Sequence, residues 1–161
     1  MTIKVGDKLP SVTLRQVTSE GPKEISTDEF FRGKKVALFA VPGAFTPACS
    51  QRHLPGYVEK ATDIKAKGVD EVACVAVNDA AVMTAWGKDQ RCEGKVSMLA
   101  DGSGDLARAL GLELDLTKMG LGIRSKRYSM LVDNGVVKSL NVEAQPGQVE
   151  ASGADAMLRS L

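Results

Sequence analysis

The chain has 161 residues, 43% of them apolar and 25% charged, which predicts one globular domain spanning 1–161. The 21 basic and 20 acidic side chains leave a net charge of +1, which argues against nucleic acid or a membrane surface as a partner. No stretch is apolar for long enough to cross a membrane, and the N-terminal residues lack the apolar centre of a secretory signal, so we expect a cytoplasmic location.

The first elements lead to one strongly apolar strand. Short β-type pieces are expected near 11–14, a polar connection over 18–23, and then a short helix capped by Ser26. Residues 35–41 read Lys-Val-Ala-Leu-Phe-Ala-Val, the composition of a buried strand.

A helix is predicted shortly after this strand. Pro55 lies inside its apolar pattern, so we expect a kink or break near Leu54, and Gly68 is expected to end it. The apolar residues that recur at helical spacing are Leu54, Tyr57, Val58, Ala61 and Ile64.

The second half of the chain alternates strands and helices, apart from a glycine-rich, loop-like stretch over 112–124. Asn134-Gly135 is a strong hairpin signal, and Ser152 is expected to cap the last helix. Such an order predicts an α/β sandwich with a mixed sheet. Strands are expected over 72–77, 96–100, 128–132 and 136–142, and helices after 79, over 105–110 and over 154–161.

Three cysteines are present: Cys49, Cys74 and Cys92. The odd count and the absence of Cys-x-x-Cys argue against a disulfide framework, a zinc site and a thiol–disulfide oxidoreductase. Cys74 lies in an apolar run, as a buried inert thiol would, whereas Cys92 follows polar residues and is expected to be exposed and incidental.

Cys49 differs from the other two in its surroundings. It follows a loop rich in proline and glycine and is expected in the first turn of a helix, where free N–H groups and the helix dipole favour an ionised thiol. The hydroxyl of Thr46 comes three residues earlier, within reach of the same point. The thiolate is the nucleophilic form of cysteine, so the sequence predicts a reactive thiol here.

The string from Pro42 to Cys49, Pro-Gly-Ala-Phe-Thr-Pro-Ala-Cys, matches the Pro-x-x-x-Thr-x-x-Cys motif of peroxiredoxins. The longer stretch 41–55 resembles the type II, peroxiredoxin-five-like subfamily. This resemblance implies a thioredoxin-like three-layer sandwich with a mixed central β-sheet flanked by helices. The likeness continues through 68–74, 77–79, 85–87, 99–102 and 124–132.

The resemblance also implies an activity. A thiol peroxidase would reduce hydrogen peroxide and organic hydroperoxides through a sulfenic acid on Cys49, without a cofactor. Glutathione with glutaredoxin, or thioredoxin, would regenerate the thiol, and the protein would be a homodimer. A redox sensor that does not turn over is the alternative, because a sensor needs the same thiolate.

Roles for the neighbouring residues follow from the same resemblance. Arg127 would stabilise the thiolate and the transition state, with Arg124 as its nearest competitor. Thr46 would donate to the peroxide or the sulfur, and Pro42 would shield the pocket from water. For His53 we favour an orienting hydrogen bond over general-base catalysis.

The resolving step leaves two options open. Cys74 matches a strand cysteine that is discussed as resolving in plant-like members, but a mid-strand position makes a disulfide with Cys49 unlikely without local unfolding. Residues 145–161 contain no late resolving cysteine. We therefore expect an external thiol to resolve oxidised Cys49.

Overall fold

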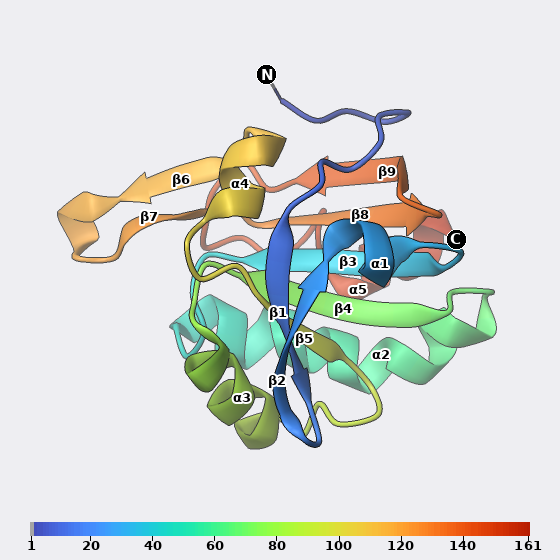
Figure 1. Ribbon diagram of the computed structural model, residues 1–161, viewed down its shortest axis with the longest axis horizontal. Coiled ribbons are helices and arrows are strands. Elements are labelled where there is room, and N and C mark those ends of the chain that lie inside the picture. Colours follow the sequence, from blue (N-terminus) through green and yellow to red (C-terminus); the bar gives the residue numbers. More distant parts are fainter. Residues whose placement is uncertain (1) are drawn as a thin grey trace.

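The computed structural model describes residues 2–161 and centres on a seven-stranded sheet (Figure 1). The strand order is β2-β1-β5-β4-β3-β8-β9. A separate two-stranded sheet, β6-β7, projects from one side of the body (Figure 1). The strands are β1 Thr13–Thr18, β2 Gly21–Ser26, β3 Lys35–Val41, β4 Glu71–Ala76, β5 Ser97–Ala100, β6 Glu113–Leu116, β7 Gly122–Ser125, β8 Tyr128–Asp133 and β9 Val136–Val142.

Helices cover both faces of the large sheet. β3 pairs in parallel with β4, and β4 with β5, whereas β8 runs antiparallel to β3 and β1 antiparallel to β5. The predicted thioredoxin-like sandwich with a mixed central sheet is confirmed. The helices are α1 Thr27–Phe31, the π-helix η1 Cys49–His53, α2 Leu54–Ala66, α3 Ala80–Asp89, α4 Asp105–Leu110, the 3₁₀ helix η2 Thr117–Met119 and α5 Ala154–Ser160.

The alternation of β3 separates two hydrophobic cores. Ala37, Phe39 and Val41 point to the side of α2, α3 and α5, while Val36, Leu38 and Ala40 point to the side of α1 and α4. Because successive side chains of a strand face opposite ways, one apolar run serves both layers. None of the helices within residues 2–161 combines the length and apolarity needed to cross a bilayer.

Several predicted elements are confirmed, and three expectations are wrong. Ser26 caps α1 by accepting from the Glu29 N–H. The stretch 112–124 is a β-hairpin rather than a loop, with polar and apolar residues alternating along β6 and left-handed glycines at its turn. The connection over 18–23 is part of the β1–β2 hairpin. Ser152 does not cap α5, since its hydroxyl donates to Glu143 instead.

One strand pairing positions the site. Ala40, near the end of β3, lies opposite Tyr128, the first residue of β8. The residue before Tyr128 is therefore held beside the point where the chain leaves β3 and enters η1. This register brings Arg127 next to Cys49, although 78 positions separate them in the sequence.

Candidate active site

The loop between β3 and η1 is shaped by close packing. Pro42 and Gly43 are buried directly after β3. A Cβ atom at Gly43 would lie 3.2 Å from Thr46 Cγ2 and 3.5 Å from Arg124 Nη1, so the loop passes where a larger residue would crowd its neighbours. Phe45 adopts a left-handed conformation with φ 64°, which is strained for a bulky residue.

The helical segment that follows begins at Pro47, so Cys49 lies in its first turn. The chain then widens into the π-helix η1, in which the Leu54 N–H donates to the Cys49 carbonyl five residues back. Pro55 has no N–H to continue an α-helical ladder, which accounts for an interruption at this place. The chain stays helical from Pro47 to Ala66, so the irregularity expected near Leu54 takes the form of a change from π-helix to α-helix rather than a break.

Two side chains reach the sulfur of Cys49. Arg127 Nη2 lies 3.0 Å and Thr46 Oγ1 2.9 Å from Sγ. Thr46 Oγ1 also lies 2.6 Å from the Gly43 carbonyl, and its single proton serves one acceptor at a time. A protonated thiol leaves that proton with Gly43, and a thiolate accepts it.

Arg127 is itself held in a fixed position. Its Nε donates to the Pro146 carbonyl at 2.8 Å, and its Nη1 lies 2.8 Å from His53 Nδ1. Its side chain is 2% exposed, and the four ion pairs within residues 2–161 do not include it. A buried guanidinium costs desolvation energy unless an anion compensates. The Cys49 sulfur, 3.0 Å from Nη2, lies where such an anion would be expected.

His53 is neutral in this arrangement. Arginine has no acceptor, so His53 Nδ1 accepts from Arg127 and the ring proton resides on Nε2, which donates to the Ser152 carbonyl at 3.0 Å. Burial first, and the charge of Arg127 second, lower the pKa of His53 to about 3. Both ring nitrogens are therefore engaged away from the sulfur, as a positioning group requires.

Arg124 has a different place. Its Nε donates to the Leu121 carbonyl at 2.7 Å and its Nη1 to the Val77 carbonyl at 3.1 Å. The guanidinium thus braces β7 against the end of β4 and the loop at Gly43, beside the site. Of the two arginines that the sequence proposes, Arg127 is the one that contacts the sulfur.

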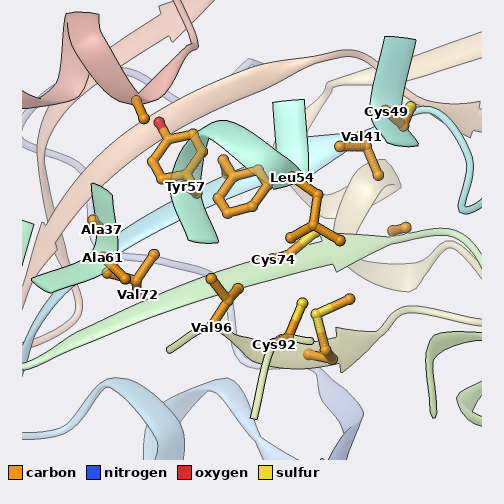
Figure 2. Packing of buried hydrophobic residues seen from close by; sticks show 14 of the residues in the cluster. Ala37, Val41, Cys49, Leu54, Tyr57, Ala61, Val72, Cys74, Cys92 and Val96 are labelled. Carbon is orange, nitrogen blue, oxygen red and sulfur yellow. The ribbon is translucent and has the colours of Figure 1, made fainter. Parts of the chain in front are cut away.

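The other two thiols lie in the same hydrophobic cluster as Cys49 (Figure 2). Cys74 is fully buried on β4, and burial raises its pKa well above the usual value. The expectation that Cys92 is exposed is wrong, because left-handed Arg91 turns the chain after α3 and Cys92 is 2% exposed. Burial raises the pKa of Cys92 to about 12. Both thiols are therefore poor nucleophiles.

Sequence reasoning missed several partners of the site. The carbonyl groups of Pro146 and Ser152 bind the side chains of Arg127 and His53, and a backbone acceptor carries no signal in residue type. Trp86, which is buried in the core, donates its indole N–H to the Ser50 hydroxyl, a contact that no motif indicates. Residues 2–161 contain no cluster of three or more His, Cys, Asp or Glu side chains that could hold a metal ion.

Comparison with known proteins covers nearly the whole chain. A family model described as Redoxin matches residues 4–158. The chain is 52% identical to the chloroplastic peroxiredoxin-2E-2 of Oryza sativa subsp. japonica, over 99% of this chain and 73% of the relative. The chain belongs to the peroxiredoxin family. The chloroplastic peroxiredoxin-2E of Arabidopsis thaliana is 49% identical, over 99% of this peroxiredoxin and 70% of the relative.

A solved structure is similarly close. Reduced Prx3 from Vibrio vulnificus, in complex with H₂O₂, superposes with a TM-score of 0.93 at 53% identity, covering 99% of both chains. This peroxiredoxin is a thiol peroxidase, and the sensor alternative is not favoured. The family implies peroxide substrates and a thioredoxin-type reductant. Because two of its relatives are chloroplastic proteins, similarity does not support the expected cytoplasmic location.

Proposed function

We propose that Cys49 is the residue that attacks the peroxide. The single observation that carries this assignment is the convergence of Arg127 Nη2 and Thr46 Oγ1 on its sulfur, at 3.0 and 2.9 Å. A fixed cation and a hydroxyl donor favour the thiolate, which is the nucleophilic form. The buried, protonated Cys74 and Cys92 have no comparable partners in the contacts given above.

The reaction transfers two electrons from sulfur to the peroxide. The Cys49 thiolate attacks the terminal oxygen of a hydroperoxide, an S–O bond forms and the O–O bond breaks. The leaving oxygen takes up one proton and departs as water or an alcohol, and the sulfur remains as a sulfenic acid. Arg127 donates to the negative charge that spreads over sulfur and both oxygens, and Thr46 orients the peroxide.

The surroundings of the loop suit this chemistry. Pro42 is buried between β3 and Gly43, where we propose that it keeps water from the peroxide. A relative, reduced Prx3, has been solved in complex with H₂O₂, which supports a small peroxide as substrate of this site. Neither ring nitrogen of His53 contacts the sulfur, so the thiolate forms without a general base at that position.

We propose that an external thiol returns Cys49 to its reduced form. The thiol condenses with the sulfenic acid to give a mixed disulfide and water, and a second thiol then releases Cys49. Cys74 and Cys92 are both buried in the core, which supports an outside reductant over an internal one. Two reductant systems are suitable: glutathione together with glutaredoxin, or thioredoxin.

A homodimer is the proposed assembly. Phe45 is 52% exposed on the loop next to Cys49, and the projecting β6–β7 hairpin exposes Met119 and Ile123. Large exposed apolar side chains of this kind are typical of a contact surface. Sedimentation or light scattering measures the assembly directly, and a monomer at all concentrations would exclude it.

Peroxide consumption tests the function. With reductant in excess, the unaltered protein should consume peroxide continuously under a thioredoxin or glutaredoxin system, whereas Cys49→Ser should consume none. Turnover that survives in Cys49→Ser would place the chemistry on another thiol. Mass spectrometry after peroxide and glutathione should show one glutathione on Cys49, and an internal Cys49–Cys74 disulfide in its place would overturn the proposed resolving route.

A further inference from the structure

A continuous chain of hydrogen bonds leads away from the active site behind Arg127. Arg127 Nη1 donates to His53 Nδ1 at 2.8 Å, and His53 Nε2 donates to the Ser152 carbonyl at 3.0 Å. The Ser152 N–H in turn donates to Glu143 Oε2 at 2.7 Å. Arg127, His53 and Ser152 are all buried, with at most 2% of each exposed. Water therefore has little access to these three residues and cannot easily replace their hydrogen bonds.

Glu143 anchors the far end of this chain. Its Oε2 accepts from the Ser152 N–H and hydroxyl and from the Glu150 N–H. Burial works to raise the pKa of Glu143, but hydrogen bonds from Ser152, Glu150 and Ala151 outweigh it and lower the pKa. The carboxylate is thus charged when it binds, and charge-assisted hydrogen bonds are the strong ones.

The anchor is connected to Arg127 a second time through the backbone. The Glu143 N–H donates to the Arg127 carbonyl at 2.9 Å. The Pro146 carbonyl, three residues later, accepts from Arg127 Nε at 2.8 Å. The short segment 143–146, directly after β9, therefore fixes both the backbone and the guanidinium of Arg127. The side chain of Glu143 holds this segment against Ser152.

Ser152 decides which ring nitrogen of His53 carries the proton. A carbonyl facing Nε2 requires the proton there, which leaves Nδ1 as an acceptor for Arg127. If the Ser152 carbonyl turned away, the proton could move to Nδ1 and would then oppose the Arg127 N–H. Tyr57 donates to the same carbonyl at 2.8 Å and gives it a second tether.

We propose that Glu143 and Ser152 are positioning residues for peroxide reduction. They fix the tautomer and orientation of His53, and through His53 they hold the Arg127 guanidinium against the reacting sulfur. This proposal rests on the proposed roles of Cys49 and Arg127. It assigns a function to a carboxylate that contacts neither the sulfur nor Arg127 through its side chain.

Glu143→Ala is the principal variant, and kcat/KM for hydrogen peroxide is the principal measurement. We expect a fall of about tenfold, the size of one charge-assisted hydrogen bond lost at Arg127. The fraction of Cys49 present as thiolate at a given pH, followed by the rate of alkylation, should fall in parallel. Glu143→Gln keeps an acceptor oxygen without charge and should give an intermediate loss.

A matched control distinguishes the loss of this chain of hydrogen bonds from a general loss of negative charge. Glu59→Gln removes an exposed carboxylate from α2 and should leave both measurements unchanged. Chemical unfolding of each variant reports stability. If Glu143→Ala lowers stability but leaves the thiolate fraction unchanged, its role is structural and the proposal is wrong.

A double-mutant cycle tests whether Glu143 acts on Arg127 by way of His53. Glu143→Ala should reduce kcat/KM about tenfold in the unaltered protein but by clearly less in a His53→Ala background, where only the connection through the Pro146 carbonyl remains. Independent, multiplying losses would contradict the proposal. The variant Arg127→Lys tests the proposed function of Arg127 itself. If it leaves the thiolate fraction of Cys49 unchanged, that function is wrong as well.

The single histidine of the chain gives a direct spectroscopic measurement. Nitrogen-15 NMR of the imidazole should show one neutral ring with its proton on Nε2 in the unaltered protein. Glu143→Ala should convert part of this signal to the other tautomer or to a mixture. An unchanged tautomer, together with unchanged alkylation, would remove the basis of the inference.

Discussion

Trp86 on α3 donates its indole N–H to the Ser50 hydroxyl over 3.0 Å, one residue beyond Cys49. The Gln90 amide adds a second bond, to the Ser50 carbonyl, at 3.2 Å. These two contacts tie the start of the π-helix η1 to α3. Cys49 is 0% exposed, so a thiol reductant reaches the oxidised sulfur only after local movement, and we expect η1 to move away from α3 in this step.

Trp86→Phe removes the first of these bonds while keeping an aromatic ring in the core. We expect the free energy of unfolding to fall by about 1–2 kcal/mol, and reduction of oxidised Cys49 to become faster because η1 opens more easily. Peroxide turnover at low reductant concentration measures that step, and circular dichroism measures unfolding. Gln90→Ala should act in the same direction, and slower reduction in both variants would contradict the role of the tether.

Thr46→Val removes the hydroxyl that contacts Sγ and keeps the volume of the side chain. Loss of one preorganised donor typically costs about a hundredfold in rate, so kcat/KM for hydrogen peroxide should fall by about that factor. Thr46→Ser retains the hydroxyl and serves as the matched control, with activity close to that of the unaltered protein. Equal activities of the valine and serine variants would exclude the hydroxyl from the reaction.

The buried His53 predicts a loss of stability in mild acid. Its pKa falls from 6.5 in the unfolded chain to about 3 in the fold, so protons bind the unfolded chain first as the pH falls. The contribution is complete above pH 6.5 and is lost between pH 6.5 and 3. From pH 7 to pH 5 we expect the free energy of unfolding to fall by about 2 kcal/mol.

Urea unfolding at each pH measures this dependence, and the composition makes the test clear. His53 is the single histidine, so few other side chains titrate between pH 7 and 5. His53→Gln lacks the titrating ring and should be less stable at pH 7 but nearly insensitive to pH in this window. A pH dependence as steep in the variant as in the unaltered protein would assign the effect to other groups.

The site divides into parts that the sequence predicts and parts that it does not. Cys49 and Thr46 are neighbours along the chain, so a short motif with a helix start suffices to place them together. Arg127 depends on the β3–β8 register, and the family resemblance rather than any local pattern indicates it. Backbone acceptors such as the Ser152 carbonyl are invisible in a sequence, because every residue has one.

Two of the wrong predictions concern places where residues in a left-handed conformation set the path of the chain. Local polarity suggested that Cys92 was exposed, but the left-handed turn at Arg91 directs it into the core. In the β6–β7 hairpin the strands are only four residues long, and the left-handed Gly120 and Gly122 at its turn are residues typical of a loop. Long, strongly apolar strands such as β3 were predicted with correct bounds because their burial is written in their composition.

A double variant, Cys74→Ala with Cys92→Ala, tests the external resolving route. Both thiols are buried and poorly ionised, so we expect most of the glutaredoxin- or thioredoxin-supported turnover to remain. The two small cavities should lower the free energy of unfolding by about 1–3 kcal/mol. The rate of peroxide consumption decides the question, because loss of turnover in a protein that is still folded would identify one of the two as a resolving cysteine.

Gly43→Ala probes how closely the loop is fitted around Thr46. A methyl group at this position would lie 3.2 Å from Thr46 Cγ2, so the threonine must shift by a few tenths of an ångström. Its hydroxyl is on the same Cβ and would move relative to Sγ, and we expect kcat/KM for hydrogen peroxide to fall about tenfold. Combining Gly43→Ala with Thr46→Ser removes the clashing methyl group while keeping the hydroxyl, so activity should recover. If the double variant remains as slow as Gly43→Ala alone, the glycine acts on the site by a route other than contact with Thr46.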